Sequence, residues 1–407
     1  MKTEADMKRI IAVLLVAIIV FSFTAAGAEN YYDYRVHDQY FAPFAPELFG
    51  DNNVLYHAWG DRDGNVGLDW HLLWYRDGKL FRDFAYSTEK RFNQSIFLPR
   101  EDNTCGVLVP GRKETRMADL GWDSNEIEPA INYIELYEWT DNGLELQKQI
   151  PGDWEWTDIK TTDDGFVTYD PLKGTLSCFD SYGNLLQEIP MTEKIPQTEI
   201  MQQMRYGQLV NITGEISEQC VILFRTEIAN ARNARYLALC LDHLKEKWTR
   251  KYQFSPGIVF PGDGYFYCLE RVNDSKTSPV KIIRLDEQGN DLFSRMLLAD
   301  NLVLGFHVKT SPLTGNLMLY GKAVANSKKI YNVFRMDLDE NMNQVSLDVR
   351  QIDYYDDYSP SVQMQKNGSL FVHCVGGEEA DRLMNVPTVL IPYDVLPVAE
   401  THGLQLK

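Results

Sequence analysis

The chain of 407 residues carries 40 Lys and Arg against 58 Asp and Glu, a formal net charge of −18. Such a negative field repels phosphate groups, which argues against nucleic acid or an anionic membrane as a partner. No Pro-, Ser- or Gly-rich linker divides the sequence, so we expect one domain over residues 29–407, acting as a monomer.

The first 28 residues are typical of a signal peptide. Basic residues precede an apolar run over residues 10–23, and the small residues 26–28 match the pattern that signal peptidase accepts. Cleavage after Ala28 leaves a mature chain that begins at Glu29 and is secreted or held at the cell surface. The alternative is an uncleaved membrane anchor, since residues 10–28 form an uncharged stretch close to the length that spans a bilayer, about 20 residues.

A repeated strand pattern follows over the rest of the chain. An Asp-, Asn- or Gly-containing turn leads into a short apolar strand seven times, and the intervals between the copies are 50, 61, 54, 45, 52 and 52 residues. Repeats of this length indicate a propeller or a solenoid. The copies begin at Asn53, Asn103, Asp164, Glu218, Asp263, Gly315 and Asn367.

Each copy is followed by two more strands joined by a tight turn, as over residues 71–81, 133–144, 176–186 and 280–293, with looser copies at 236–248, 331–345 and 389–398. Gly, Asn and Asp supply the positive φ that short hairpin turns need. We therefore expect an all-β fold, a β-propeller of seven blades with four antiparallel strands each. In architecture alone the chain resembles the quinoprotein-like and Trp-Asp-repeat propeller families. The signature residues of those families do not recur, so the resemblance implies no quinone, and we expect no cofactor.

One acidic segment of the first blade is a weak candidate for a calcium site. Asp61, Asp63, Asn65 and Asp69 alternate around a tight turn, as ligands of a hard cation do. The segment departs from the helix-loop-helix calcium pattern at Gly64 and Leu72. A hairpin loop without metal explains the same residues, and we favour that interpretation, so no metal site is predicted.

Aromatic and acidic residues gather in segments that the propeller register places on one face. Loops from second to third strands and links from blade to blade leave the same side of a propeller, so the insertion 112–130, the link 151–158 and the link 353–358 belong to one rim. Aromatic rings pack on the CH faces of sugars, and carboxylates accept hydrogen bonds from hydroxyls. The alternative is that Trp154 and Trp156 only pack between blades. The candidate ligand-binding residues are Trp122, Asp123, Trp154, Trp156, Asp158, Tyr355 and Asp356.

The cysteines and histidines suggest packing more than chemistry. The chain has six cysteines, mostly inside apolar strands, where free thiols behave as small hydrophobic groups. One disulfide is a hypothesis: Cys220 and Cys240 come opposite each other if the hairpin between them turns near Asn230. For the histidines in predicted strands we expect roles in packing; they are His57, His71, His307 and His373.

Two classes of function remain. No nucleophile elbow, metalloprotease motif or phosphate-binding loop occurs in the sequence, so the catalytic residues are unknown. We favour a secreted or cell-surface binding module for a carbohydrate or protein ligand. The alternative is an extracellular glycan-active hydrolase or lyase, whose acid and base would come from Asp123, Glu126, Glu155 and Asp158.

Overall fold

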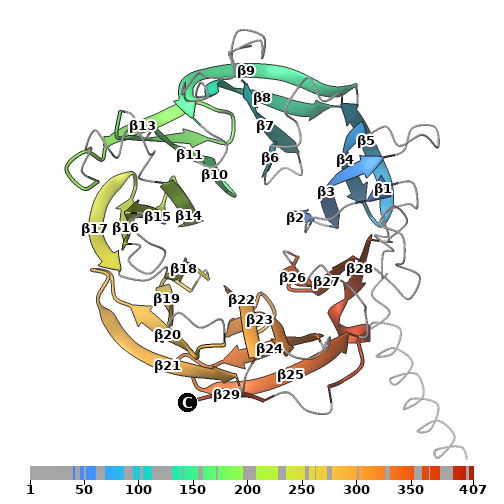
Figure 1. Cartoon of the computed structure of the whole chain (residues 1–407), viewed down its shortest axis with the longest axis vertical. Coiled ribbons are helices and arrows are strands. Elements are labelled where there is room, and N and C mark those ends of the chain that lie inside the picture. The colour runs from blue at the N-terminus through green and yellow to red at the C-terminus, as the bar shows by residue number, and fades with distance from the viewer. Residues whose placement is uncertain are drawn as a thin grey trace, which may run out of the picture.

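A computed structural model gives the structure of the chain. The described residues form seven antiparallel sheets that stand as blades around one axis, a seven-bladed β-propeller (Figure 1). The predicted all-β propeller fold is confirmed. The structure describes residues 40–41, 46–49, 52–60, 69–86, 95–100, 104–111, 131–140, 142–154, 159–170, 173–195, 208–227, 235–252, 256–261, 263–272, 277–299, 302–325, 331–352, 360–365, 367–375, 388–399 and 403–407.

The blades follow chain order, and we number them I to VII. In blade I, β1 (Tyr40–Phe41) and β2 (Glu47–Phe49) both pair with β3 (Asn53–Gly60), and β4 (Asp69–Arg76) and β5 (Lys79–Tyr86) follow. Blade II consists of β6 (Ile96–Pro99), β7 (Cys105–Gly111), β8 (Ile131–Thr140) and β9 (Gly143–Trp154). Blade III consists of β10 (Ile159–Thr162), β11 (Gly165–Asp170), β12 (Thr175–Asp180) and β13 (Leu185–Pro190).

Blade IV consists of β14 (Gln208–Gly214), β15 (Gln219–Glu227), β16 (Arg235–Asp242) and β17 (Lys245–Tyr252). Blade V has β18 (Gly257–Val259), β19 (Phe266–Arg271), β20 (Val280–Leu285), β21 (Asp291–Ala299) and a fifth strand, β29 (Leu404–Leu406). Blade VI has β22 (Leu302–Thr310), β23 (Leu317–Ala325), β24 (Tyr331–Leu338) and β25 (Gln344–Ile352). Blade VII has β26 (Ser361–Met364), β27 (Leu370–Val375) and β28 (Thr388–Pro392), and the 3-10 helix η4 (Tyr393–Val395) follows.

The predicted repeat coincides with the blades. All seven copies of the motif lead into second strands, namely β3, β7, β11, β15, β19, β23 and β27. Six of the seven predicted hairpins are the third and fourth strands of blades I to VI. The exception is residues 389–398, where β28 is followed by η4 and not by a fourth strand.

The hydrophobic core is divided into seven clusters, one at each joint between neighbouring blades, including the joint that closes the ring between blades VII and I. Strand β11 shows why its sequence is almost wholly apolar. Phe166 packs into the cluster shared with blade II, while the next residue, Val167, packs into the cluster shared with blade IV. Because successive side chains of a strand point to opposite faces, a blade between two neighbours buries both sides of its strands.

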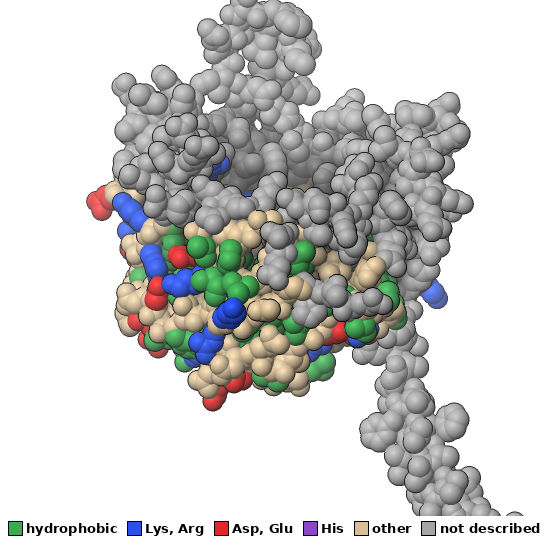
Figure 2. Space-filling view, turned by 60° about the horizontal axis from the view of Figure 1, so that its bottom comes forward, with side chains coloured by type: hydrophobic (Ala, Val, Ile, Leu, Met, Phe, Trp, Pro, Cys, Tyr) green, Lys and Arg blue, Asp and Glu red, His purple; other side chains and the backbone are tan. Residues whose placement is uncertain are grey.

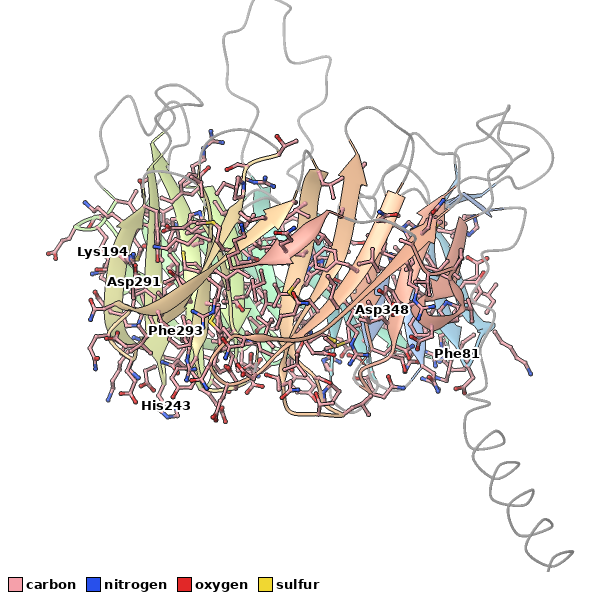
Figure 3. All side chains as sticks on the ribbon, turned by 90° about the horizontal axis from the view of Figure 1, so that it is seen from below. Phe81, Lys194, His243, Asp291, Phe293 and Asp348 are labelled. Atoms are coloured by element: carbon pink, nitrogen blue, oxygen red, sulfur yellow. The ribbon has the colours of Figure 1, made fainter. Side chains whose placement is uncertain are left out.

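The two faces of the ring differ in their connections. Turns from first to second and from third to fourth strands lie on one side, which we call the lower face; His243, in the turn between β16 and β17, marks it at the bottom of Figure 3. The ends of the second and fourth strands lie on the opposite side, which we call the upper face. The longest lower-face connections between described strands have six residues, 260–265 and 311–316. On the upper face, 19 residues (112–130) separate Gly111 from Ile131.

Three lower-face turns share one hydrogen-bonded form, after β12, β20 and β24. In the second of them, Asp286 Oδ1 accepts from the amides of Gln288 (2.9 Å) and Asn290 (2.7 Å), and its Oδ2 accepts from Asn290 Nδ2 (3.1 Å). These hydrogen bonds, with the Asn290 amide foremost, lower the pKa of Asp286. Asp180 and Asp339 make the same set of contacts. The carboxylates of these turns are therefore occupied by their own loops.

Basic side chains tie most outer strands to the next blade. A Lys or Arg on the fourth strand donates to a backbone carbonyl at the lower-face turn of the following blade, at distances from 2.5 to 3.1 Å. The joint between blades III and IV uses Asp164 instead, which accepts from the amides of Ile216 (2.9 Å) and Ser217 (2.8 Å). The five basic donors are Arg82, Lys148, Arg250, Arg295 and Arg350.

The C-terminal segment leaves blade VII and runs along the outer edges of blades VI and V. The Ala399 amide donates to the Val349 carbonyl (2.9 Å), and β29 then pairs with β21. Blade V thereby gains a fifth strand, whereas the described part of blade VII has three.

The predicted disulfide is wrong. All six cysteines are free and buried. In the β15–β16 hairpin Cys220 pairs with Leu241 and Cys240 with Val221, an offset of one residue. Cys220 therefore packs toward blade III and Cys240 toward blade V, on opposite faces of the sheet.

Candidate functional site

The upper face carries the ends of the segments in which the rim residues were predicted. Trp154 is the last residue of β9 and pairs with Ile131, the first residue of β8. The insertion 112–130 and the link 155–158 thus leave blade II from paired positions. Trp154 is the one rim residue within the described strands; Trp122, Asp123, Trp156, Asp158, Tyr355 and Asp356 lie outside the described residues.

The third predicted segment begins elsewhere on the ring. Ile352 ends β25 in blade VI, and Figure 1 shows β25 across the ring from β9. The structure therefore brings together the ends of the two segments around Trp154, and it separates them from the start of the link that contains Tyr355.

Asp69 is the one residue of the weak calcium candidate that the structure describes. Asp69 begins β4 and pairs with Gly60, while Asp61, Asp63 and Asn65 fall outside the described residues. Among the residues that the structure describes, no group of three or more His, Cys, Asp or Glu side chains could hold a metal ion.

Glu47 is an acidic residue that the sequence did not single out. It lies in β2, the inner strand of blade I, and its side chain reaches solvent. Protein atoms around its carboxyl group nevertheless restrict its hydration. This desolvation, with a smaller contribution from the negative charge of Asp163, raises the pKa of Glu47 to about 7. A carboxyl group with such a pKa can donate a proton near neutral pH.

The histidines of the inner half of the ring have different roles. His57 packs against Phe97 of blade II, with ring centroids 4.5 Å apart, and burial lowers its pKa to about 4. Its Nδ1 is buried without a hydrogen-bond partner. His71 and His373 are also buried. The ring of His307 on β22 stacks on Tyr320, with ring centroids 5.4 Å apart, although the residue as a whole is exposed. Desolvation of the ring, followed by the charges of Lys309 and Lys322, lowers the pKa of His307.

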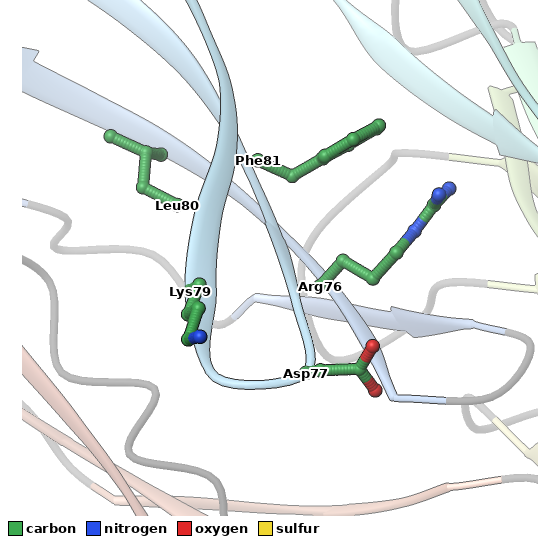
Figure 4. A pocket seen from close by; sticks show the side chains of 5 residues that line it. All are labelled: Arg76, Asp77, Lys79, Leu80 and Phe81. Carbon is green, nitrogen blue, oxygen red and sulfur yellow. The ribbon is translucent and has the colours of Figure 1, made fainter.

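A hollow of about 560 Å³ surrounds the β4–β5 turn on the lower face of blade I (Figure 4). Arg76, Asp77, Lys79, Leu80 and Phe81 line it. In Figure 4, Leu80 points away from the side of the hairpin on which Arg76 and Phe81 lie. The lining groups do not converge on one point, so the hollow lacks the convergent polar contacts of a ligand pocket.

Exposed aromatic rings on the described surface are covered by guanidinium groups. Figure 2 shows basic and hydrophobic side chains next to one another on this surface. The Arg284 guanidinium lies 3.6 Å from the ring centre of Tyr265, and that of Arg76 lies 4.2 Å from the ring centre of Phe81. These cation–π contacts occupy ring faces that a sugar would otherwise use.

Comparisons with known proteins assign no family to the chain. No protein-family model matches the chain, and no curated protein does. Among solved structures it is similar to a member of the duf4221 family from Bacteroides vulgatus, at 8% identity and a TM-score of 0.35, covering 92% of this chain and 96% of that one. It is also similar to an α-L-arabinofuranosidase of Fusarium graminearum, at 10% identity and a TM-score of 0.42, covering 90% and 99%. A neuraminidase-like protein of a bat influenza virus is similar at 10% identity and a TM-score of 0.37, covering 73% and 86%.

Proposed function

We propose that the protein is a secreted or cell-surface propeller that binds a carbohydrate or protein ligand on its upper face. The observation that carries the proposal is the difference between the two faces. Lower-face turns are short, and the carboxylates of three of them, Asp180, Asp286 and Asp339, accept hydrogen bonds from their own loops, whereas the long connections leave from the upper face. Long connections on a rigid scaffold are where binding residues concentrate.

The chemistry of the ligand follows from the segments around Trp154. Residues 122–123 and 154–158 together supply three Trp and two Asp residues, and their ends leave blade II at the paired residues Ile131 and Trp154. Flat rings beside carboxylates suit the CH and OH groups of a glycan. The N-terminal segment with its signal-peptide pattern supports export.

Affinity electrophoresis of the exported protein, in gels that contain single polysaccharides or mucins, tests this proposal. We expect slower migration in at least one gel, lost when both Trp154 and Trp156 are changed to Ala. Tyr182→Ala is the matched control, since Tyr182 is an exposed aromatic residue of a lower-face turn, with 57% of its surface accessible. Unchanged migration in every gel would contradict a carbohydrate ligand. Loss of binding in the Tyr182→Ala variant would indicate a site on the lower face and contradict the proposed site on the upper face.

A glycan-active enzyme is the second candidate, and the raised pKa of Glu47 favours it. Glycoside hydrolysis needs a protonated carboxyl group and a second carboxylate, and Asp163 is the charged neighbour of Glu47. Reducing-end release from the same polysaccharides measures this activity. Loss of this activity in Glu47→Gln would identify Glu47 as the catalytic acid. Loss of the activity in Asp158→Asn would identify Asp158 instead. If no glycan releases reducing ends, the protein is better described as a binding module.

A further inference from the structure

Blade VI carries its charges in pairs along the outer half of the face that meets blade VII. On β24, Arg335 Nε lies 3.4 Å from Asp337 Oδ1, and on β25, Arg350 Nε lies 2.9 Å from Asp348 Oδ2. Val333 of β24 packs into the cluster with blade VII, and the residues two and four positions further along share its face. Each base on these outer strands therefore has an acid beside it.

The inner half of the same face is basic. His307 and Lys309 lie on β22, and Lys322 lies on β23, opposite Gly305 of β22. Val308 packs into the cluster with blade V, so the alternating positions 305, 307 and 309 face blade VII. Neither β22 nor β23 contains an Asp or Glu residue. Three basic side chains thus share one region of this face, in a chain whose net charge is −18.

Packing holds two of these groups at the inner end of the blade. The His307 ring stacks on the ring of the buried Tyr320, with centroids 5.4 Å apart and an angle of 28° between the planes. A methyl group added to Gly305 would lie 3.2 Å from Lys322 Cε, so the Lys322 stem passes over β22 where that strand has no side chain. In Figure 1, β22 lies on the inner side of blade VI, toward the axis of the ring. The basic groups therefore lie on the axial side of the blade.

The charges of these groups oppose one another. Desolvation, followed by the charges of Lys309 and Lys322, lowers the pKa of His307, and burial lowers the pKa of Lys322. A bound anion would act in the opposite sense, because a nearby negative charge favours the protonated form of histidine and lysine. The folded chain thus holds the three groups in an electrostatically unfavourable arrangement that an anion would relieve.

The neighbouring strands of blade VII add no charge to this region. β26, which lies against β23, has the sequence Ser-Val-Gln-Met and no titratable group. On β27, His373 faces blade I, where its ring lies 6.5 Å from that of Tyr56. Beyond the ion pairs of β24 and β25, the titratable groups that face His307 from the described strands are therefore Tyr320 and the two lysines.

We propose that His307 and Lys309, reinforced by the charge of Lys322, bind an oxyanion: a carboxylate, or a tetrahedral dianion such as sulfate. Side chains two residues apart on a strand start roughly 7 Å apart, and the flexible lysine stem lets its ammonium group approach an anion held by the imidazole. Since protonated His307 adds a positive charge, the affinity for the anion rises as the pH falls through the pKa of His307. The site is separate from the residues around Trp154, so its test does not depend on the proposed function.

NMR of the exported protein, labelled with ¹³C in its histidine rings, tests the proposal in sodium chloride, sodium sulfate and sodium acetate at equal ionic strength. The His307 resonance, identified by its absence in His307→Gln, should give a pKa about one unit higher in sulfate or in acetate than in chloride. His243 is the internal control, because its side chain is 77% exposed in a lower-face turn, and its titration curve should be the same in all three salts.

The pattern of responses identifies the ligand chemistry. A response of His307 to sulfate alone would identify a tetrahedral dianion, and a response to acetate alone would identify a carboxylate. An unchanged pKa of His307 in both salts would overturn the proposal.

Two lysine variants separate a local site from the field of the whole chain. Lys309→Gln should reduce the difference between the pKa values of His307 in sulfate or acetate and in chloride by at least about half, because it removes the second group that contacts the anion. Lys251→Gln removes the same charge from the exposed side of the outer strand β17, and the difference should persist in full. Equal differences in the two variants would contradict a site at His307 and Lys309.

Discussion

The joint between blades V and VI and the joint between blades VII and I differ in the number of buried residues that the structure describes at each. Among the described residues, the first holds 17 buried residues, including Ala399 and Leu404 of the C-terminal segment. The second holds seven described buried residues, five from blade I and two from blade VII. The described residues contribute to closure of the ring through side-chain packing and through the contact of Gln363 Nε2 with the Pro46 carbonyl.

The largest expected effect is the loss of unfolding free energy when a buried aromatic residue is removed from the hydrophobic cluster at either of these two joints. Phe334 is fully buried between blades V and VI. Phe334→Ala should lower the free energy of unfolding of the protein by about 3–5 kcal/mol. Phe371→Ala, between blades VII and I, should cost less because fewer buried groups surround its ring. Urea unfolding of both variants measures the difference, and an equal or larger loss for Phe371 would show that closure is as strong as the continuous joint.

The joint between blades III and IV extends the comparison to a polar contact. Burial alone would raise the pKa of Asp164, but the amides of Ser217 and Ile216 outweigh it and lower the pKa. The stabilisation is thus complete at neutral pH and is lost as the pH falls below about 4 through the depressed pKa. Asp164→Ala should cost about 2 kcal/mol at pH 7. Asp163→Ala, its exposed neighbour, is the control, and equal losses in the two would contradict the role of Asp164.

The joint between blades I and II should depend on pH through His57. Its pKa of about 4 lies below the ordinary value of 6.5, so the unfolded chain binds the proton first. Stability is then full above pH 6.5 and falls by up to about 1.4 kcal/mol per unit of pH below it, until the folded pKa is reached. Glu47 acts in the opposite sense, because its raised pKa favours the folded state as the pH falls from about 7.

The test is therefore the difference between the wild type and His57→Gln in unfolding free energy at pH 7.5 and 5.5. The wild type should lose about 1 kcal/mol more than the variant over this range. A parallel pH dependence of the two proteins would mean that His57 is not the titrating group.

The smallest expected effect concerns the basic donors. Arg295→Ala removes hydrogen bonds to the Asn341 carbonyl (3.1 Å) and Asn343 Oδ1 (2.9 Å), and should cost roughly 1 kcal/mol. Lys251→Ala, an exposed basic residue of another fourth strand, should cost nothing measurable. Thermal unfolding compares them, and a null result for Arg295 would show that such donors orient the blades without stabilising them.

The repeat could be predicted because its signal is local. Turn residues such as Asp164 and Asn367 precede apolar strands, and short hairpins fix their own register. The short inner strands β18 and β26 lack such a signal, with three and four residues each. The partner of β29 is β21, which lies about a hundred residues earlier in the sequence. The sequence of residues 404–406 contains no signal that predicts this pairing.

The candidate site was less accessible to prediction than the fold. The sequence analysis placed Trp154 within the link 151–158 between blades II and III, whereas in the structure β9 continues to Trp154. The raised pKa of Glu47 comes from desolvation in the folded chain and from Asp163, more than a hundred residues away in the sequence. The disulfide failed for a different reason: an offset of one residue sends Cys220 and Cys240 to opposite faces.

The C-terminal strand has a mechanical consequence. β29 pairs with β21 at an open sheet edge, and the Lys407 backbone exchanges hydrogen bonds with Met296 at its very end. A pull on the C-terminus would therefore load these bonds one after another, as in opening a zipper. Under force, the strand should peel from blade V at low load and lengthen the molecule in a distinct early step, before any blade leaves the ring.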